Sequence, residues 1–288
     1  MSLLGRLVAL LAVRGCWSVH NGALNQLGLE CGTDKASNIH DFLDFYEEGL
    51  PRNISRLLEV GIKDGRSICV WSAYYKDATV HGWHGWDLSE QRLLDVTRMS
   101  GLEGTVTRRV DQLETGDGPL TVAAAGAEQP GPYDIVVDDG LHSTKSMWNT
   151  LVSLWPYVMP GGIFIMEDLH ACLHFHGGHH GSLCDQEHRT QPTMFELLVA
   201  LNHDKEGALR LIERAKVPGD WTSLAEELQG VEFHMSPAGC VSATSAGFAK
   251  VLRQWGVDDD ASEQYTDKII ERKVGCHHAT SILTKKQQ

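Results

Sequence analysis

Short apolar runs alternate along the first 170 residues with stretches whose apolar positions recur at helical spacing. The runs predict buried strands of a parallel sheet, and the stretches predict the helices that cover it. We expect strands at 56–61, 79–86, 105–110, 135–137 and 163–166, and helices at 39–48, 66–75, 93–99, 120–127 and 146–155. This alternation is typical of an α/β fold with a doubly wound, mostly parallel sheet.

The pattern loosens after residue 170. A segment rich in histidine and glycine at 171–191 predicts a loop that covers a substrate, with a transition-metal site as the less favoured alternative. We expect helices at 193–200, 207–215 and 221–229, and strands at 231–235 and 280–284, the last of which closes the sheet. The chain therefore divides into an N-terminal helical segment at 1–50 packed on the core and one domain at 51–288, with a helical insertion before the last strand.

Glycine and proline mark the expected breaks. Gly61 and Gly65 follow the first strand and allow a sharp turn into the next helix. Their spacing departs from G-x-G-x-x-G, which argues against a standard dinucleotide fingerprint. The run Pro160-Gly161-Gly162 is expected to end the helix that precedes the strand at 163–166.

Composition excludes several classes of protein. The formal net charge of −13 disfavours a nucleic-acid binder and docking on anionic lipid. The seven cysteines contain no C-x-x-C pair, so we expect reduced thiols in a cytoplasmic protein. The apolar run at 7–13 is too short to span a bilayer and predicts a terminal amphipathic helix, with export as a minority alternative.

Acidic residues follow two neighbouring strands of the predicted sheet. Asp138 and Asp139 end the strand at 135–137, and Glu167 and Asp168 end the strand at 163–166. Ligands of an open α/β sheet bind beyond the carboxyl ends of its strands, so these side chains are expected to converge. Carboxylates suit Mg²⁺, Mn²⁺ or Ca²⁺. The competing interpretation is that Asp139 caps a helix and that Glu167-Asp168 is a solvated loop.

A histidine accompanies this acidic edge. His142 stands three positions after Asp139, near the start of the next helix. Its ordinary pKa near neutrality suits a histidine to accept a proton from a hydroxyl. A lone histidine is more often structural, so the assignment depends on its acidic neighbours.

Polar residues at the ends of the first three strands indicate a nucleoside-type cofactor. Glu59 lies in the first strand before the glycine turn, and a helix N-terminus after that turn attracts a carboxylate. Asp87 is placed to accept the ribose hydroxyls, although alone it is equally well explained as a helix N-cap. Asp111 and Gln112 follow the third strand, near an adenine. This order is the one expected for S-adenosylmethionine, and we assign Asp138 to the cofactor side as well.

Five stretches together resemble a known family. They are CGTDKASNIHDFLDFYEEGL, LLEVGIKDGRSICVW, VDQ, DDGLH and PGGIFIMEDLH. They look like the macrolide-sugar O-methyltransferases of the macrocin and mycinamicin type, which are related to cephalosporin-hydroxylase-like proteins. The resemblance covers roughly 25–170 and the final strand. It implies a Rossmann-like class I methyltransferase fold that uses S-adenosylmethionine and Mg²⁺ (or Mn²⁺).

The same resemblance implies roles for individual residues. Asp139, Glu167 and Asp168 match the metal ligands, and His142 matches the general base. Glu59, Gly61, Asp87 and Asp111 match the cofactor contacts. This chain departs from the family at Leu141, where a small residue is usual, and after His170, where the T-S-Y sequence is replaced.

The chemistry that follows is methyl transfer to a hydroxyl. We expect the metal to bind two vicinal hydroxyls of a sugar or another diol, a catechol included, and to lower the pKa of the attacking one. His142 would then remove the proton, with Asp139 beside it in the catalytic group. Two alternatives are a metal-dependent hydrolase or hydroxylase, and a non-catalytic binding protein with a methyltransferase fold. Assembly into a homo-oligomer is an open alternative, and we expect no nucleic-acid or membrane partner.

Overall fold

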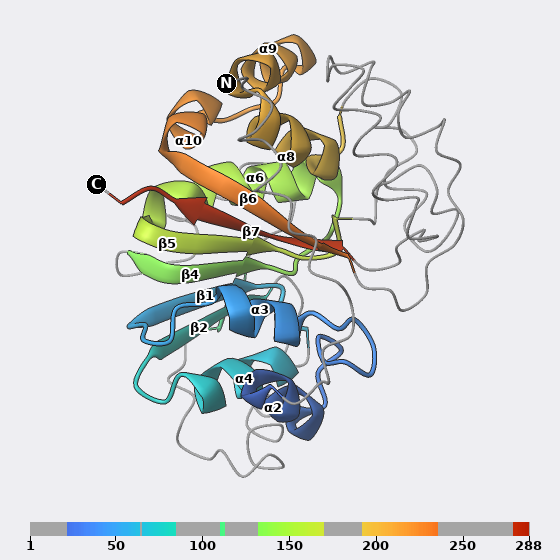
Figure 1. The fold of residues 1–288 in the computed structure, drawn as a ribbon, viewed down its shortest axis with the longest axis vertical. Coiled ribbons are helices and arrows are strands. Elements are labelled where there is room, and N and C mark those ends of the chain that lie inside the picture. Colours follow the sequence, from blue (N-terminus) through green and yellow to red (C-terminus); the bar gives the residue numbers. More distant parts are fainter. Residues whose placement is uncertain are drawn as a thin grey trace, which may run out of the picture.

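The computed structural model describes residues 22–63, 65–84, 110–112, 132–169, 192–235 and 279–287. They build a seven-stranded sheet with helices on both faces (Figure 1). Its strands are β1 (Arg56–Val60), β2 (Thr79–His84), β3 (Val110–Gln112), β4 (Tyr133–Asp138), β5 (Val158–Met166), β6 (Leu228–Met235) and β7 (Ala279–Lys285). The helices are α2 (Ala23–Cys31), α3 (Leu43–Gly49), α4 (Arg66–Tyr74), α6 (Thr144–Leu154), α8 (Met194–His203), α9 (Lys205–Ala215) and α10 (Trp221–Glu227), and the 3₁₀ helix η1 is Trp155–Tyr157.

The strand order is β3-β2-β1-β4-β5-β7-β6. Strands β1 to β5 pair in parallel, and β7 is antiparallel to both β5 and β6. The chain order reverses between β1 and β4, which lie side by side. This is the switch point at which doubly wound sheets bind ligands beyond the strand ends. The prediction of a mostly parallel, doubly wound α/β sheet is confirmed.

Alternate residues of the central strands pack into two separate cores. On one face, Leu58, Val136 and Phe164 pack with residues of α6, α8, α9 and α10. On the other face, Leu57 and Ile135 belong to the core that includes residues of α2, α3 and α4. Figure 1 shows these two groups of helices on opposite sides of the sheet. Because both faces are covered, the central strands are apolar at successive positions, which is why they were recognisable in the sequence.

Three predicted boundaries are wrong. Asp111 and Gln112 were expected to follow the third strand, but they lie within β3 and pair with the end of β2. The run Pro160-Gly161-Gly162 lies inside β5 and does not precede it. A register shift between Tyr133 and Ile135 of β4 accommodates the extra residues there as a bulge, where proline and glycine are tolerated.

The third boundary lies between α10 and β6. The helix was expected to continue to residue 229, but Leu228 and Gln229 belong to β6. Leu228 pairs with Lys285 of β7, and Lys286 donates its backbone N–H to the Glu227 carbonyl. Pairing with a strand that is distant in sequence therefore overrides the local helical pattern at these two residues.

The N-terminal segment contains a helix and a disulfide that the sequence did not reveal. Helix α2 packs beside α4, and Cys31 at its end is bonded to Cys69 within α4, with a Cα–Cα distance of 6.0 Å. The prediction that the cysteines are reduced is therefore wrong for this pair. The two residues are 38 positions apart, so only the packing of the helices brings them together.

Several expectations fall outside the described residues. They concern the terminal apolar run at 7–13, the helices at 93–99 and 120–127, Asp87, and the histidine-rich segment at 171–191. Among the helices that the structure does describe, none combines the length and apolar character needed to cross a bilayer.

Candidate active site at the carboxyl edge of the sheet

Backbone hydrogen bonds bring the acidic residues of two strands together. The backbone N–H of Asp139 donates to the Val60 carbonyl at 2.9 Å, just beyond the paired part of β1 and β4. The backbone N–H of Glu167 donates in the same way to the Asp138 carbonyl at 2.9 Å. These two bonds fix where each acidic residue leaves the sheet. The sequence prediction that the acids meet at one sheet edge is confirmed.

The turn after β1 leaves room for this arrangement. Gly61 has a left-handed backbone with φ +91°, and a Cβ at this position would lie 2.0 Å from the Asp139 carbonyl oxygen. Any larger residue would therefore collide with the loop that carries the aspartate. The glycine predicted as part of a cofactor turn also allows the close approach of the acidic loop.

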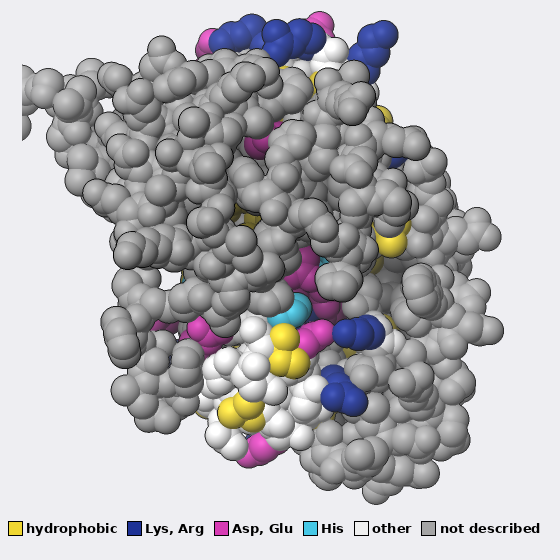
Figure 2. Space-filling view, turned by 90° about the vertical axis from the view of Figure 1, so that its right-hand side faces the viewer, with side chains coloured by type: hydrophobic (Ala, Val, Ile, Leu, Met, Phe, Trp, Pro, Cys, Tyr) yellow, Lys and Arg dark blue, Asp and Glu magenta, His cyan; other side chains and the backbone are white. Residues whose placement is uncertain are grey.

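Three side chains form a group able to hold a metal ion. Asp139, His142 and Asp168 each offer one ligand atom, and the three atoms lie within 4.8 Å of one another. His142 Nε2 is 3.6 Å from Asp139 Oδ1 and 3.4 Å from Asp168 Oδ2. Figure 2 shows acidic side chains and a histidine gathered near the middle of this face.

Two members of the group have an unusual backbone. His142 has φ 58° and Asp168 has φ 52°, both in the left-handed region. Such conformations are uncommon for residues with a side chain and cluster at functional sites, where the surrounding structure enforces them. Ser143 follows as the N-cap of α6, its hydroxyl accepting from the Ser146 N–H at 3.1 Å. The start of α6 thus fixes the histidine beside the two aspartates.

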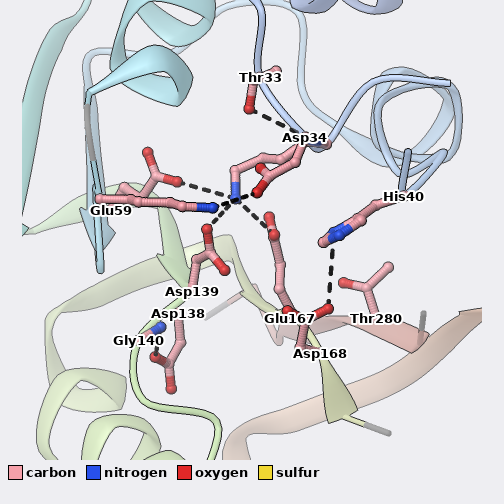
Figure 3. A network of polar contacts seen from close by, with 12 residues as sticks. Thr33, Asp34, His40, Glu59, Asp138, Asp139, Gly140, Glu167, Asp168 and Thr280 are labelled. Carbon is pink, nitrogen blue, oxygen red and sulfur yellow. Dashed lines mark hydrogen bonds and ion pairs between the residues drawn. The ribbon is translucent and has the colours of Figure 1, made fainter. Parts of the chain in front are cut away.

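A buried lysine, which the sequence analysis did not assign to the site, lies at the centre of the cluster. Lys35 is 1% exposed, and its Nζ lies 2.5 Å from Asp139 Oδ2, 2.6 Å from Glu167 Oε2 and 3.4 Å from Glu59 Oε1. Figure 3 shows the three carboxylates pointing toward this common nitrogen. They come from the ends of β1, β4 and β5, so the lysine joins all three strands.

Burial and charge shift the ionisation of this cluster. Burial alone would lower the pKa of Lys35, but the facing carboxylates outweigh it and hold the pKa well above its usual value. Burial raises the pKa of Glu167 well above its ordinary value and also raises that of Asp168. The lysine opposes the shift of Glu167, and His142 opposes that of Asp168. Both carboxylates therefore stand in surroundings that favour an added positive charge.

The residues predicted to contact a cofactor are described in part. Burial raises the pKa of Glu59 to about 7, although Lys35 opposes the shift, and Trp71 Nε1 donates to Glu59 Oε2 at 3.1 Å. Burial also raises the pKa of Asp138 to about 7. The Gly140 N–H donates to Asp138 Oδ1 at 3.2 Å. Asp138 therefore stabilises the loop that follows β4 and carries Asp139.

Helix α4 begins immediately after the glycine turn, with Gly65 at its N-cap and no side-chain cap. Its first backbone N–H groups are suited to an anionic end of a ligand. Asp111 and Gln112 lie in β3 opposite Trp83 and His84, which places them on the far side of β2 from Glu59. Asp87 is not among the described residues.

A second histidine lies near the group of side chains that could hold a metal ion. His40 Nδ1 is 3.9 Å from Asp168 Oδ1, a contact drawn in Figure 3. It precedes Asp41, which also has a left-handed backbone at φ 60°. Like Lys35, it comes from the N-terminal segment, and the stretch GTDKASNIH was the sequence signal that contained both.

The donor set fits a divalent cation. Asp139, His142 and Asp168 are close enough to share one ion. In addition, Glu167 Oε1 is buried and accepts no hydrogen bond from the described residues. A buried carboxylate oxygen without a donor is costly unless a cation or another ligand satisfies it. The predicted roles of Asp139, Glu167 and Asp168 as ligands, and of His142 as base, stay predictions.

Comparison with known proteins identifies the domain that carries this site. Residues 58–169 match a family model described as a methyltransferase domain. Demethylmacrocin O-methyltransferase of Streptomyces fradiae is 30% identical over 165 residues, which are 54% of this chain and 38% of that protein. Mycinamicin VI 2''-O-methyltransferase of Micromonospora griseorubida is 26% identical, with the same coverage. The match thus spans little more than a third of each relative's length.

A solved structure supports the fold. MycE methyltransferase from the mycinamycin biosynthetic pathway, in complex with Mg and SAH, superimposes with a TM-score of 0.53 at 18% sequence identity. The superposition covers 92% of this chain and 55% of that one. The sheet therefore has the class I methyltransferase fold, residues 58–169 match a methyltransferase domain, and the chain shows distant homology to the demethylmacrocin and mycinamicin VI O-methyltransferases.

Proposed function

We propose that this protein is an S-adenosylmethionine-dependent, metal-dependent O-methyltransferase that methylates one hydroxyl of a sugar or another vicinal diol. The observation that carries the proposal is the group formed by Asp139, His142 and Asp168 at the carboxyl edge of a methyltransferase domain. The proposal is supported by relatives whose names specify O-methylation of demethylmacrocin, of a rhamnosyl-tetracenomycin and of mycinamicin VI.

The residues present suit each requirement of the reaction. S-adenosylmethionine supplies an electrophilic methyl group, so the protein must chiefly align and activate the hydroxyl. The turn from Gly61 to Gly65 and the start of α4 would hold the amino-acid end of the cofactor. Glu59, Asp87, Asp111, Gln112 and Asp138 are the proposed remaining contacts.

The metal, Mg²⁺ or Mn²⁺, would be held by Asp139 and Asp168, with Glu167 as the third carboxylate. When bound, such an ion orients vicinal hydroxyls and makes them more acidic. His142 would take the proton of the attacking hydroxyl. Its Nε2 faces Asp139 and Asp168 at 3.6 and 3.4 Å, so both carboxylates stabilise the imidazolium that results.

The test begins with calorimetric titration of S-adenosylmethionine and S-adenosylhomocysteine into the full chain, with and without Mg²⁺. Transfer of a radiolabelled methyl group is then measured to a panel of glycosides and catechols. The matched control for each acceptor is its analogue with one of the two neighbouring hydroxyls removed. We expect saturable cofactor binding, and transfer only to acceptors that keep both hydroxyls.

The two alternatives predict other outcomes. A metal-dependent hydrolase or hydroxylase would show no affinity for S-adenosylmethionine, and that result would overturn the proposal. A binding protein with a methyltransferase fold would bind the cofactor and transfer nothing to any acceptor. Transfer to acceptors with a single hydroxyl, at the same rate as to diols, would exclude the bidentate role of the metal.

A further inference from the structure

The segment from Cys31 to Lys35 enters the active site from outside the matched methyltransferase domain, which begins at residue 58. It is fastened to the domain at three points. The Cys31–Cys69 disulfide joins it to α4, Arg66 Nη1 donates to the Gly32 carbonyl at 2.8 Å, and Lys63 Nζ lies 3.0 Å from Asp34 Oδ2. These contacts hold the segment against the glycine turn and the start of α4.

Lys35 extends from the end of this segment into the acidic cluster. Its own backbone is fixed as well, because its carbonyl accepts from the Phe42 N–H at 2.9 Å. The side chain reaches residues that lie 104 and 132 positions further along the chain. The lysine is therefore held at its backbone by the N-terminal segment and at its tip by the strand ends.

Lys35 contacts only one oxygen of the Asp139 carboxylate and one oxygen of the Glu167 carboxylate. It contacts Oδ2 of Asp139, whereas Oδ1 of that residue faces His142 at 3.6 Å. It contacts Oε2 of Glu167, whereas Oε1 accepts no hydrogen bond from the described residues. The contacts thus fix both carboxylates while each keeps an oxygen for another cation.

We propose that Lys35 is a positioning residue for the metal site: it fixes the Asp139 and Glu167 carboxylates so that their remaining oxygens bind a divalent cation. The inference rests on the proposed function. It makes the N-terminal segment part of the active site, although that segment lies outside the matched domain. Without the ammonium group, the buried carboxylates of Glu59, Asp139 and Glu167 would repel one another and move apart.

The direct test is Mn²⁺ binding to the full chain, measured by calorimetry for wild type and Lys35→Gln. We expect the variant to bind Mn²⁺ at least tenfold more weakly. Lys76→Gln is the matched control, because it removes the same charge from an exposed side chain that takes no part in the contacts holding the segment. The control should bind within about twofold of wild type, as surface charges contribute little. Equal or tighter binding by Lys35→Gln would overturn the inference.

A second variant separates positioning from simple charge balance. The combination of Lys35→Gln with Glu59→Gln has the same formal net charge as wild type but lacks the lysine contacts. We expect its Mn²⁺ affinity to stay low. If the double variant bound Mn²⁺ as tightly as wild type, the lysine would contribute charge alone and the positioning role would be excluded.

A spectroscopic measurement covers the case in which Lys35→Gln does not fold. Lys35→Arg keeps the positive charge, but a planar guanidinium cannot place one nitrogen among three carboxylates in the same way. We expect the electron paramagnetic resonance spectrum of bound Mn²⁺ to change in this variant, and an unchanged spectrum would contradict positioning. If wild type bound S-adenosylhomocysteine but no Mn²⁺, the lysine inference would fail while the cofactor part of the proposed function stood.

Discussion

His142 Nε2 lies 3.4 Å from Asp168 Oδ2, and both residues hold a left-handed backbone. The contact joins the start of α6 to the end of β5. Two neighbouring residues with this uncommon conformation would raise the free energy of the fold unless the surrounding contacts stabilised it. The surrounding structure therefore enforces the conformation of this pair, as is common at functional sites.

Replacing His142 should slow methyl transfer strongly without preventing binding of the cofactor. In His142→Asn, asparagine tolerates the left-handed backbone, so the loop should keep its shape. We expect the rate of methyl transfer to fall about 10²- to 10⁴-fold because the proton acceptor is lost. Single-turnover kinetics with a responsive acceptor measure the rate, and calorimetry checks that S-adenosylhomocysteine still binds. A rate within threefold of wild type would exclude His142 as the base.

Replacing the aspartate should affect the metal more than the fold. Asp168→Asn also suits the left-handed backbone and removes one carboxylate charge. We expect Mn²⁺ affinity to fall at least about tenfold. The melting temperature of the metal-free protein should stay the same or rise, because a carboxylate near like charges is removed. Calorimetry and thermal unfolding test both parts, and a large loss of stability with unchanged metal affinity would assign Asp168 a structural role.

The glycine turn should not accept a side chain. In Gly61→Ala the new Cβ would lie 2.0 Å from the Asp139 carbonyl oxygen, and the backbone at φ +91° is unfavourable for alanine. We expect a loss of stability of at least about 2 kcal/mol and weakened cofactor binding. Gly230→Ala is the matched control, since nothing lies within 4 Å of its added Cβ. Equal urea midpoints for the two variants would contradict the expectation.

Reduction of the disulfide should lower stability. The Cys31–Cys69 bond closes a loop with a separation of 38 residues, for which the chain-entropy estimate is about 4 kcal/mol. We expect the paired Cys31→Ser and Cys69→Ser variant to unfold at lower urea concentration than wild type. In reducing agent, the urea midpoint of wild type should fall toward that of the variant. The midpoint of the variant should not change when the reagent is added. Identical midpoints in all four measurements would show that the bond contributes nothing.

The buried capping glutamate of α8 should make stability depend on pH. Burial raises the pKa of Glu196 to about 7, although its hydrogen bond from the Thr193 N–H opposes the shift. Because this pKa is raised on folding, its stabilising effect is complete below about 4.5 and is lost as pH rises through about 7. Glu196→Gln keeps an acceptor for the cap but cannot ionise. As pH rises from 5 to 8, the urea midpoint of this variant should increase relative to that of wild type. If the midpoints of the two proteins changed in parallel with pH, the raised pKa of Glu196 would be contradicted.

The sequence alone predicts the strands and the acidic edge where the local pattern of residues agrees with the fold. The apolar runs at the centres of β1, β4 and β5 are buried on both faces, so their identity could be read directly. The acids that follow these runs met at the predicted sheet edge, because parallel strands end on the same side. His142 joined them since a short loop leads from Asp139 into α6.

The rest depended on contacts between distant residues. Lys35 lies 104 positions before Asp139, and no periodic pattern marks a lysine as buried. Cys31 and Cys69 meet only because α2 packs on α4. The Pro160-Gly161-Gly162 run indicates a break by local rules, yet a bulge retains it within β5. In each case a contact with a residue distant in sequence determines the local structure, and a single sequence does not reveal that contact.

The position of β7 also bears on how the protein is made. Within the described residues, β7 is the strand that joins β6 to the sheet, and its Thr280 hydroxyl donates to the Met166 carbonyl beside the acidic edge. During synthesis, β5 and β6 emerge from the ribosome before their common neighbour does. The edges of both strands are then open to pairing with other nascent chains. The sheet beside the candidate active site therefore cannot be completed before β7 has been synthesised.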